Sequence, residues 1–250
     1  MDPKYKIDSK KAKMNLLEAL KIIRCDEAFA QLTGYPNIQP NQCGALTSEY
    51  DYLKQQSMAT WQCNISQIEV PITDAGMKDY CPTLLVGGEI FSVNGAITHS
   101  SFSLCVTFSS SPAKKAAGQP NTGSCCLASY HDKKRVVRRF HFDHQPNETN
   151  KPSDHLQFGG NFPGLGSAQT EPHYCIESVD NPRLHYLPMD FILLFDLAIR
   201  DFKTPLTSLI EEKSWRKLVV TSQNIWWSEY LDWLRATVTK KTQLHEIVYG

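Results

Sequence analysis

The chain lacks a long apolar stretch of the kind that crosses a membrane. A spanning helix needs about 20 consecutive apolar residues, whereas the apolar run that begins at Phe191 is already interrupted at Asp196. The charged N-terminal segment also lacks the apolar centre of a signal peptide. We therefore expect a cytoplasmic protein that makes no contact with membranes.

The chain also has no excess of charge. Lys and Arg number 26, as do Asp and Glu, so the global electrostatic footprint of a nucleic-acid-binding protein is absent. A local basic cluster at Lys133, Lys134, Arg135 and Arg138 is still a candidate nucleic-acid contact. Clusters of this kind are also typical of charged strand edges that only solubilise the sheet.

Common ligand-binding signatures are missing as well. There is no C-x-x-C pair, no H-E-x-x-H motif and no phosphate-binding glycine loop, so no cofactor is expected. The eight cysteines are scattered along a chain without an export signal. Buried free thiols are therefore the prediction for all eight.

The patterns that are present predict an α+β protein. Residues 1–250 are read as a single domain, in which 1–60 form N-terminal helices and 61–160 form an antiparallel sheet of about five to seven strands. An irregular loop is expected over 161–187. C-terminal helices follow over 188–250.

Helical spacing of apolar residues places the individual helices. The first is predicted over 9–33 with Ser9 as its N-cap. Pro188 suits the first turn of a helix that runs to Phe202 and packs on the sheet. Two further helices are predicted, one within 206–219 and one from about 222 to 239.

Turn signals divide the strand region. The Asn-Gly dipeptide at 94–95 predicts a tight hairpin, and the Gly-Gly dipeptide at 87–88 predicts a break between two strands. Segments 125–131 and 135–143 are read as a further hairpin.

The most informative segment lies between residues 138 and 160. Phe140 and Phe142 alternate with polar residues, and after a short polar loop Leu156 and Phe158 alternate in the same way. If the two segments pair as antiparallel strands, their apolar side chains face a core. The opposite face then collects five side chains that form the candidate catalytic site: Arg139, His141, Asp143, His155 and Gln157.

Three interpretations of this face are open from the residues. Histidine as acid or base with arginine on a phosphate suits a metal-independent nuclease. A zinc site needs four ligands in tetrahedral reach, but no fixed ligand spacing is present, and no metal is assigned. A solvated polar face of the sheet is the third interpretation. The zinc ligands would come from the following residues: His141, Asp143, His155, and His144, Asp154 or His173.

The last predicted helix carries more large apolar residues than one narrow stripe needs. Trp226, Tyr230 and Trp233 share one helical face, whereas Trp227 and Leu231 lie away from it. Trp227 and Leu231 are therefore candidate partner-binding residues.

Seven positions follow one another in an order that is shared with a known group of proteins: Arg139, Asp143, His155, Gln157, Pro182, Arg183 and Pro188. Through these positions, residues 135–205 resemble an uncharacterised family of small bacterial proteins found near toxin–antitoxin and phage-defence genes. The resemblance implies an accessory subunit of a bacterial multi-protein defence or toxin-like system. Such a subunit acts mainly through protein–protein contacts, and nucleic acid is considered as a second kind of partner. The alternative function is a stand-alone nuclease-type effector that uses the His/Asp/Arg face.

Overall fold

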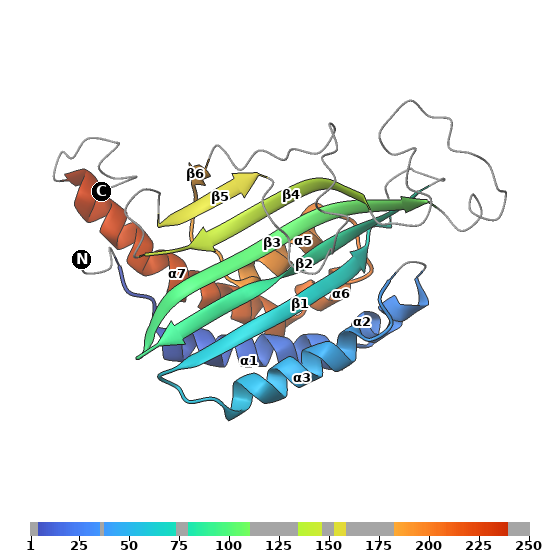
Figure 1. Ribbon diagram of the computed structural model, residues 1–250, viewed down its shortest axis with the longest axis horizontal. Helices are drawn as coiled ribbons and strands as arrows, with labels where there is room; N and C mark the ends of the chain where they lie inside the picture. The colour runs from blue at the N-terminus through green and yellow to red at the C-terminus, as the bar shows by residue number, and fades with distance from the viewer. Residues whose placement is uncertain are drawn as a thin grey trace.

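The computed structural model describes residues 5–35, 38–73, 80–110, 135–146, 153–158 and 183–239. Its centre is a twisted antiparallel sheet in which the six strands lie side by side in chain order (Figure 1). Helices precede and follow the sheet in the sequence, so the α+β class is confirmed. The strands are β1 (Trp61–Pro71), β2 (Tyr80–Val93), β3 (Ala96–Ser110), β4 (Arg135–His144), β5 (Asp154–Phe158) and β6 (Arg183–His185).

The β2–β3 hairpin turns at the predicted Asn-Gly dipeptide. Asn94 and Gly95 both have positive φ angles, 53° and 80°, which is the geometry that a two-residue hairpin loop requires. The predicted break at the Gly-Gly dipeptide is wrong, because β2 runs through Gly87 and Gly88 without interruption. Glycine is needed there for another reason: a Cβ atom on Gly88 would lie 2.1 Å from the carbonyl oxygen of Ser101.

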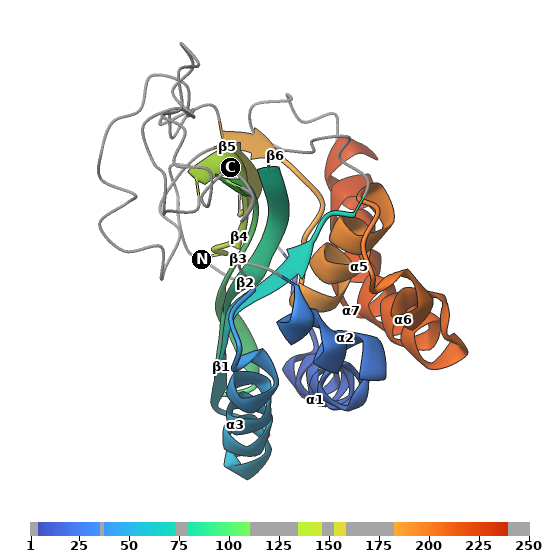
Figure 2. The same ribbon diagram turned by 90° about the vertical axis from the view of Figure 1, so that its right-hand side faces the viewer.

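Helices cover one face of this sheet. Figure 2 shows α1, α5, α6 and α7 on the same side of the strands, and α3 beside β1. The elements are α1 (Ser9–Cys25), α2 (Glu27–Gln31), the 3-10 turn η1 (Leu32–Gly34), α3 (Gln42–Gln55), α5 (Phe191–Asp201), α6 (Thr207–Glu211) and α7 (Lys213–Thr239).

Aspartates cap three of these helices. The carboxylates of Asp8, Asp26 and Asp190 each accept a hydrogen bond from the backbone N–H three residues later, at 2.8–3.0 Å. Asp8 therefore caps α1 in place of Ser9, and Asp26 breaks the predicted long helix into two. Pro188 lies before the cap of α5 and not in its first turn.

The C-terminal helices also differ from the prediction in length. The helix expected within 206–219 is the short α6, and α7 begins at Lys213 instead of near Ser222. The predicted contact of α5 with the sheet is confirmed, because the Phe191 ring lies 6.5 Å from the Phe102 ring of β3. Both rings are fully buried in the core.

Side chains from α3 and its C-cap occupy the outer edge of β1. The three residues that carry these side chains are spaced seven positions apart in the sequence. Their side chains form hydrogen bonds with backbone groups that an edge strand would otherwise expose. Gln42 bonds both the N–H and the C=O of Glu69, Glu49 accepts from the N–H of Asn64, and Gln56 bonds both the N–H and the C=O of Gln62, at 2.5–3.1 Å.

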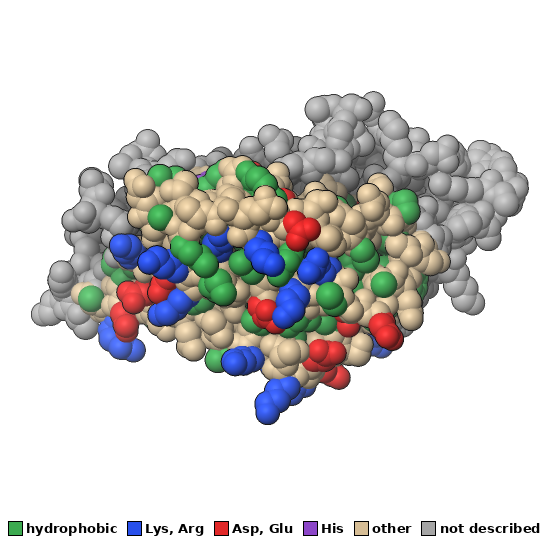
Figure 3. Space-filling view, turned by 90° about the horizontal axis from the view of Figure 1, so that it is seen from below, with side chains coloured by type: hydrophobic (Ala, Val, Ile, Leu, Met, Phe, Trp, Pro, Cys, Tyr) green, Lys and Arg blue, Asp and Glu red, His purple; other side chains and the backbone are tan. Residues whose placement is uncertain are grey.

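None of the described helices is long and apolar enough to cross a membrane. Acidic and basic side chains are interspersed over the described surface at the α1 and α3 end of the molecule (Figure 3).

Candidate functional site: the polar face of the sheet

The sheet face opposite the helices carries two rows of polar positions that cross the strands. Directly paired residues of neighbouring strands share a face, so the strand register defines both rows. The first row is Asn64, Glu89, Ser101, Asp143, His155 and the register position of His185. The second row is Gly87, Ser103, His141, Gln157 and the register position of Arg183.

The predicted pairing of the two segments is confirmed. β4 and β5 are antiparallel neighbours, with Asp143 opposite His155 and His141 opposite Gln157. Phe142 is buried in the core on the helix side, and Phe140 and Leu156 pack against that core. All five candidate catalytic residues, including Arg139, therefore belong to one face of the sheet.

Asp143 is a group of this face whose ionised form is stabilised by neighbouring side chains. Ser101 Oγ donates to its Oδ1 at 2.5 Å, and His155 Nε2 lies 3.3 Å from its Oδ2. Burial alone would raise the pKa of Asp143, but the hydrogen bonds from His155 and Ser101 and the nearby His141 lower the pKa below its ordinary value. Asp143 is therefore a carboxylate at neutral pH.

His155 is deeply buried, with 2% of its surface exposed. It contacts Asp143 and does not reach the surface. His155 therefore orients the Asp143 carboxylate. Its burial gives it no access to a polymeric substrate.

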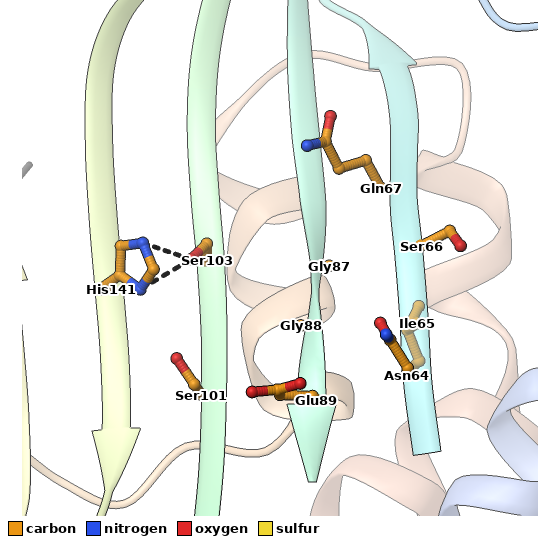
Figure 4. A pocket seen from close by; sticks show the side chains of 10 residues that line it. All are labelled: Asn64, Ile65, Ser66, Gln67, Gly87, Gly88, Glu89, Ser101, Ser103 and His141. Atoms are coloured by element: carbon orange, nitrogen blue, oxygen red, sulfur yellow. Dashed lines mark hydrogen bonds between the residues drawn. The ribbon is translucent and has the colours of Figure 1, made fainter. Parts of the chain in front are cut away.

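His141 has a different neighbour. Ser103 Oγ lies 2.9 Å from both ring nitrogens of His141. Both side chains line a cavity of about 160 Å³ that extends over β1, β2, β3 and β4 (Figure 4). Sequence reasoning found His141 but missed Ser103, because a serine within an alternating strand carries no signal of its own.

Arg139 lies across the strand pair from Cys105. Burial raises the pKa of the Cys105 thiol to about 12, and the charge of Arg139 offsets only part of this effect. Cys105 is therefore a protonated, unreactive thiol at neutral pH.

The prediction of free cysteines is confirmed for Cys25, Cys43, Cys63 and Cys105. The side chains of the other four lie outside the described residues: Cys81, Cys125, Cys126 and Cys175.

His144 and Asp154, the additional metal ligands considered above, lie on the opposite face of the sheet. Strand alternation turns them toward the helices, away from His141 and Asp143. His144 Nδ1 bonds Asp154 Oδ1 at 2.8 Å, and the Tyr5 hydroxyl donates to Asp154. The described residues contain no group of three or more His, Cys, Asp or Glu side chains that could hold a metal.

The remaining candidates are only partly visible. Lys133, Lys134 and His173 lie outside the described residues, as does the predicted strand 125–131. Arg135 and Arg138 are described by their backbone alone.

The two partner-binding candidates lie on α7. Trp227 is half-buried, and its indole N–H donates to the Pro188 carbonyl at 2.8 Å. Leu231, one turn further along, is 45% exposed.

No family model matches the chain, and no curated protein or solved structure is significantly similar to it.

Proposed function

We propose that this chain is an accessory subunit of a multi-protein assembly, of the defence or toxin-like kind that the sequence resemblance implies, and that it acts through the outer face of α7. The observation that carries the proposal is a run of exposed and half-buried apolar side chains on this helix. Large apolar groups that remain exposed together mark contact surfaces more often than isolated ones do.

The spacing of this run suits a helical partner. Successive members of the run are separated alternately by four and three positions along one face of α7. This spacing is the periodicity of a helix–helix seam. Val220 and Leu231 are 55% and 45% exposed. We call this set, which consists of four apolar residues and the exposed Asn224, the α7 stripe: Val220, Asn224, Trp227, Leu231 and Leu234.

A second exposed apolar pair supports the same surface. Leu187 and Tyr186 are 37% and 38% exposed and immediately precede Pro188, whose carbonyl accepts the Trp227 hydrogen bond. That bond fixes the half-buried indole in one orientation, and rigid aromatic side chains are typical anchors of protein interfaces.

The nuclease alternative is favoured by the grouping of Arg139, His141, Asp143 and His155 on one face. It is opposed by the burial of the two histidines, because a polymer must reach both an acid and a base, and His141 and His155 are only 9% and 2% exposed.

Affinity purification of tagged protein from the cells that express it tests the proposed contact. Leu231→Asp places a charge in the α7 stripe and should abolish co-purification of the wild-type partner, while the melting temperature changes little. Met58→Asp is the matched control, because Met58 is 43% exposed and lies between α3 and β1. Retention of the same partner by Leu231→Asp would contradict the proposal.

Incubation of the purified protein with RNA and DNA, with and without a chelator, decides the nuclease alternative. Cleavage that His155→Ala removes, in a variant that remains folded, would favour the nuclease.

A further inference from the structure

The cavity over β1 to β4 is lined by exposed residues of β1 and by buried residues of β3 and β4. Asn64 and Ser66 at its mouth are exposed, whereas Ser103 and His141 are only 3% and 9% exposed. Figure 4 shows Ser103 and His141 on neighbouring strands, with the Gln67 side chain extending from β1 over β2. A small molecule entering from the mouth would therefore meet the serine–histidine pair.

Two glycines keep this space open. Gly87 and Gly88 lie beneath the cavity, next to the register shift of β1 between Ile65 and Ile68. A Cβ atom on Gly87 would lie 2.8 Å from the carbonyl oxygen of Ile65, a distance that real Cβ contacts essentially never show. Larger residues at these positions would therefore disturb the strands as well as reduce the cavity.

Ser103 and His141 lie within the distance that a nucleophile and its general base need. Activation of a serine requires a base within about 2.6–3.2 Å of the hydroxyl oxygen, and Ser103 Oγ lies 2.9 Å from both nitrogens of His141. An oxygen at equal distance from both nitrogens lies away from the in-plane lone pair of each, so the His141 ring must turn before one nitrogen can accept the hydroxyl proton. Catalytic hydrogen bonds that are poorly aligned in a ligand-free site often align only when a substrate is bound.

A negative charge stands near the base. Asp143 is two residues from His141 on the same face of β4, and the electrostatic interaction with His141 contributes to its lowered pKa. Because the interaction is mutual, the carboxylate also stabilises the imidazolium that forms when His141 accepts a proton. Ser101 and His155 hold Asp143 in place for this effect.

We propose that Ser103 and His141 are the nucleophile and general base of an acyl-hydrolase site for small esters that carry no negative charge. A cavity of about 160 Å³ accommodates roughly six to ten non-hydrogen atoms, since an apolar cavity of similar size holds benzene. Among the described residues that line it, Glu89 carries a carboxylate and none is Lys or Arg. An anionic substrate would meet repulsion from the Glu89 carboxylate there.

The reaction needs only water as a second reactant. Ser103 Oγ forms a bond to the acyl carbon while its proton moves to His141, and the alcohol leaves with that proton. Water then attacks the acyl-serine, losing its proton to His141. The acyl–serine bond breaks, the Ser103 hydroxyl regains its proton, and a carboxylic acid is released. This activity is independent of the α7 stripe, so either proposal can fail without the other.

Reaction of the native protein with methanesulfonyl fluoride, which is small enough for the cavity, tests the nucleophile. Ser103 Oγ should displace fluoride and form a sulfonate ester, which peptide mass spectrometry locates at Ser103. His141→Ala should slow this modification by about 10²–10⁴-fold. The same variant should lose hydrolysis of phenyl acetate, an uncharged ester within the size limit of the cavity, by a similar factor.

Ser100→Ala is the matched control. Ser100 belongs to the same strand but is fully buried, and its hydroxyl has no hydrogen-bond partner among the described atoms. This variant should react as the wild type does. Absence of the ester at Ser103 in folded wild-type protein, modification of other serines only, or equal rates in His141→Ala would each overturn the proposal.

Discussion

Buried polar residues link the helices of this protein through hydrogen bonds, and Asp190 is the central residue of one such network. Its carboxylate caps α5 and accepts a hydrogen bond of 2.6 Å from Ser222 on α7. Ser222 in turn accepts from Asn15 on α1. Burial raises the pKa of Asp190 to about 6, although the bonds from Ser222 and Leu193 offset part of the effect.

This raised pKa predicts a pH dependence of stability. The folded state holds the proton more tightly than the unfolded state, so the contribution of Asp190 to the free energy of unfolding increases below pH 6 and is lost as the pH rises through 6. The change amounts to at most about 3 kcal/mol. Asp190→Asn should remove this component, which urea unfolding of both proteins at pH 5 and pH 7.5 measures. Parallel changes in the two proteins would show that Asp190 is not the responsible group.

Tyr5 provides a second prediction at the residue scale. Its hydroxyl donates to Asp154 and lies 3.3 Å from His144 Nδ1, and all three residues are buried. Tyr5→Phe keeps the ring contacts but leaves the carboxylate with one donor fewer, which should cost about 1–3 kcal/mol of unfolding free energy. Tyr35→Phe at an exposed position should change stability by less than about 0.5 kcal/mol. Equal values for the two variants in chemical denaturation would contradict this role.

At the scale of elements, α3 protects the edge of the sheet. Gln42 and Gln56 bond both backbone groups of the β1 residues that they face, and unpaired edge strands recruit other strands. The double variant Gln42→Ala/Gln56→Ala should therefore aggregate faster on mild heating, as light scattering and thioflavin fluorescence would measure. The exposed Gln55→Ala is the control, and equal aggregation of the two proteins would exclude the protective role.

Elements set by local patterns were predictable from the sequence, and those set by distant contacts were not. The alternation around Phe142 and His155 predicted the β4–β5 pairing, because a two-residue period specifies which side chains share a face. The contact between Tyr5 and His144 joins residues 139 positions apart, and neither residue carries a local signal for it. Ser103 was missed for the same reason, since its partner His141 is on another strand.

Helix ends illustrate a different limit. Asp8 and Ser9 are adjacent and both are good N-caps, so composition alone did not distinguish them. The structure selects Asp8, because the Ser9 hydroxyl is buried and bonds Ser92 and the Trp61 indole instead. Tertiary contacts thus decided between two residues that were equivalent in local propensity.

At the scale of the whole molecule, contacts between distant parts of the sequence predict cooperative folding. The Trp61 indole on β1 donates to Ser9 on α1 at 2.9 Å, and Asn15 on α1 donates to the Leu218 carbonyl and to Ser222 on α7. The same continuous hydrophobic core includes residues of the sheet and of both sets of helices. Neither the sheet nor the C-terminal helices can bury its apolar face alone, so we predict that residues 1–250 unfold as one domain.

The variant Trp61→Phe makes this prediction measurable, because the four remaining tryptophans all belong to α7. Its fluorescence reports α7 alone, whereas far-ultraviolet circular dichroism reports every helix and strand. The two signals should show the same midpoint and slope in guanidinium chloride, as two-state unfolding requires. Loss of the Trp61 hydrogen bond lowers stability in both signals equally and does not affect the comparison. An α7 transition that precedes or follows the loss of circular dichroism would instead show that the C-terminal helices form a separate unit.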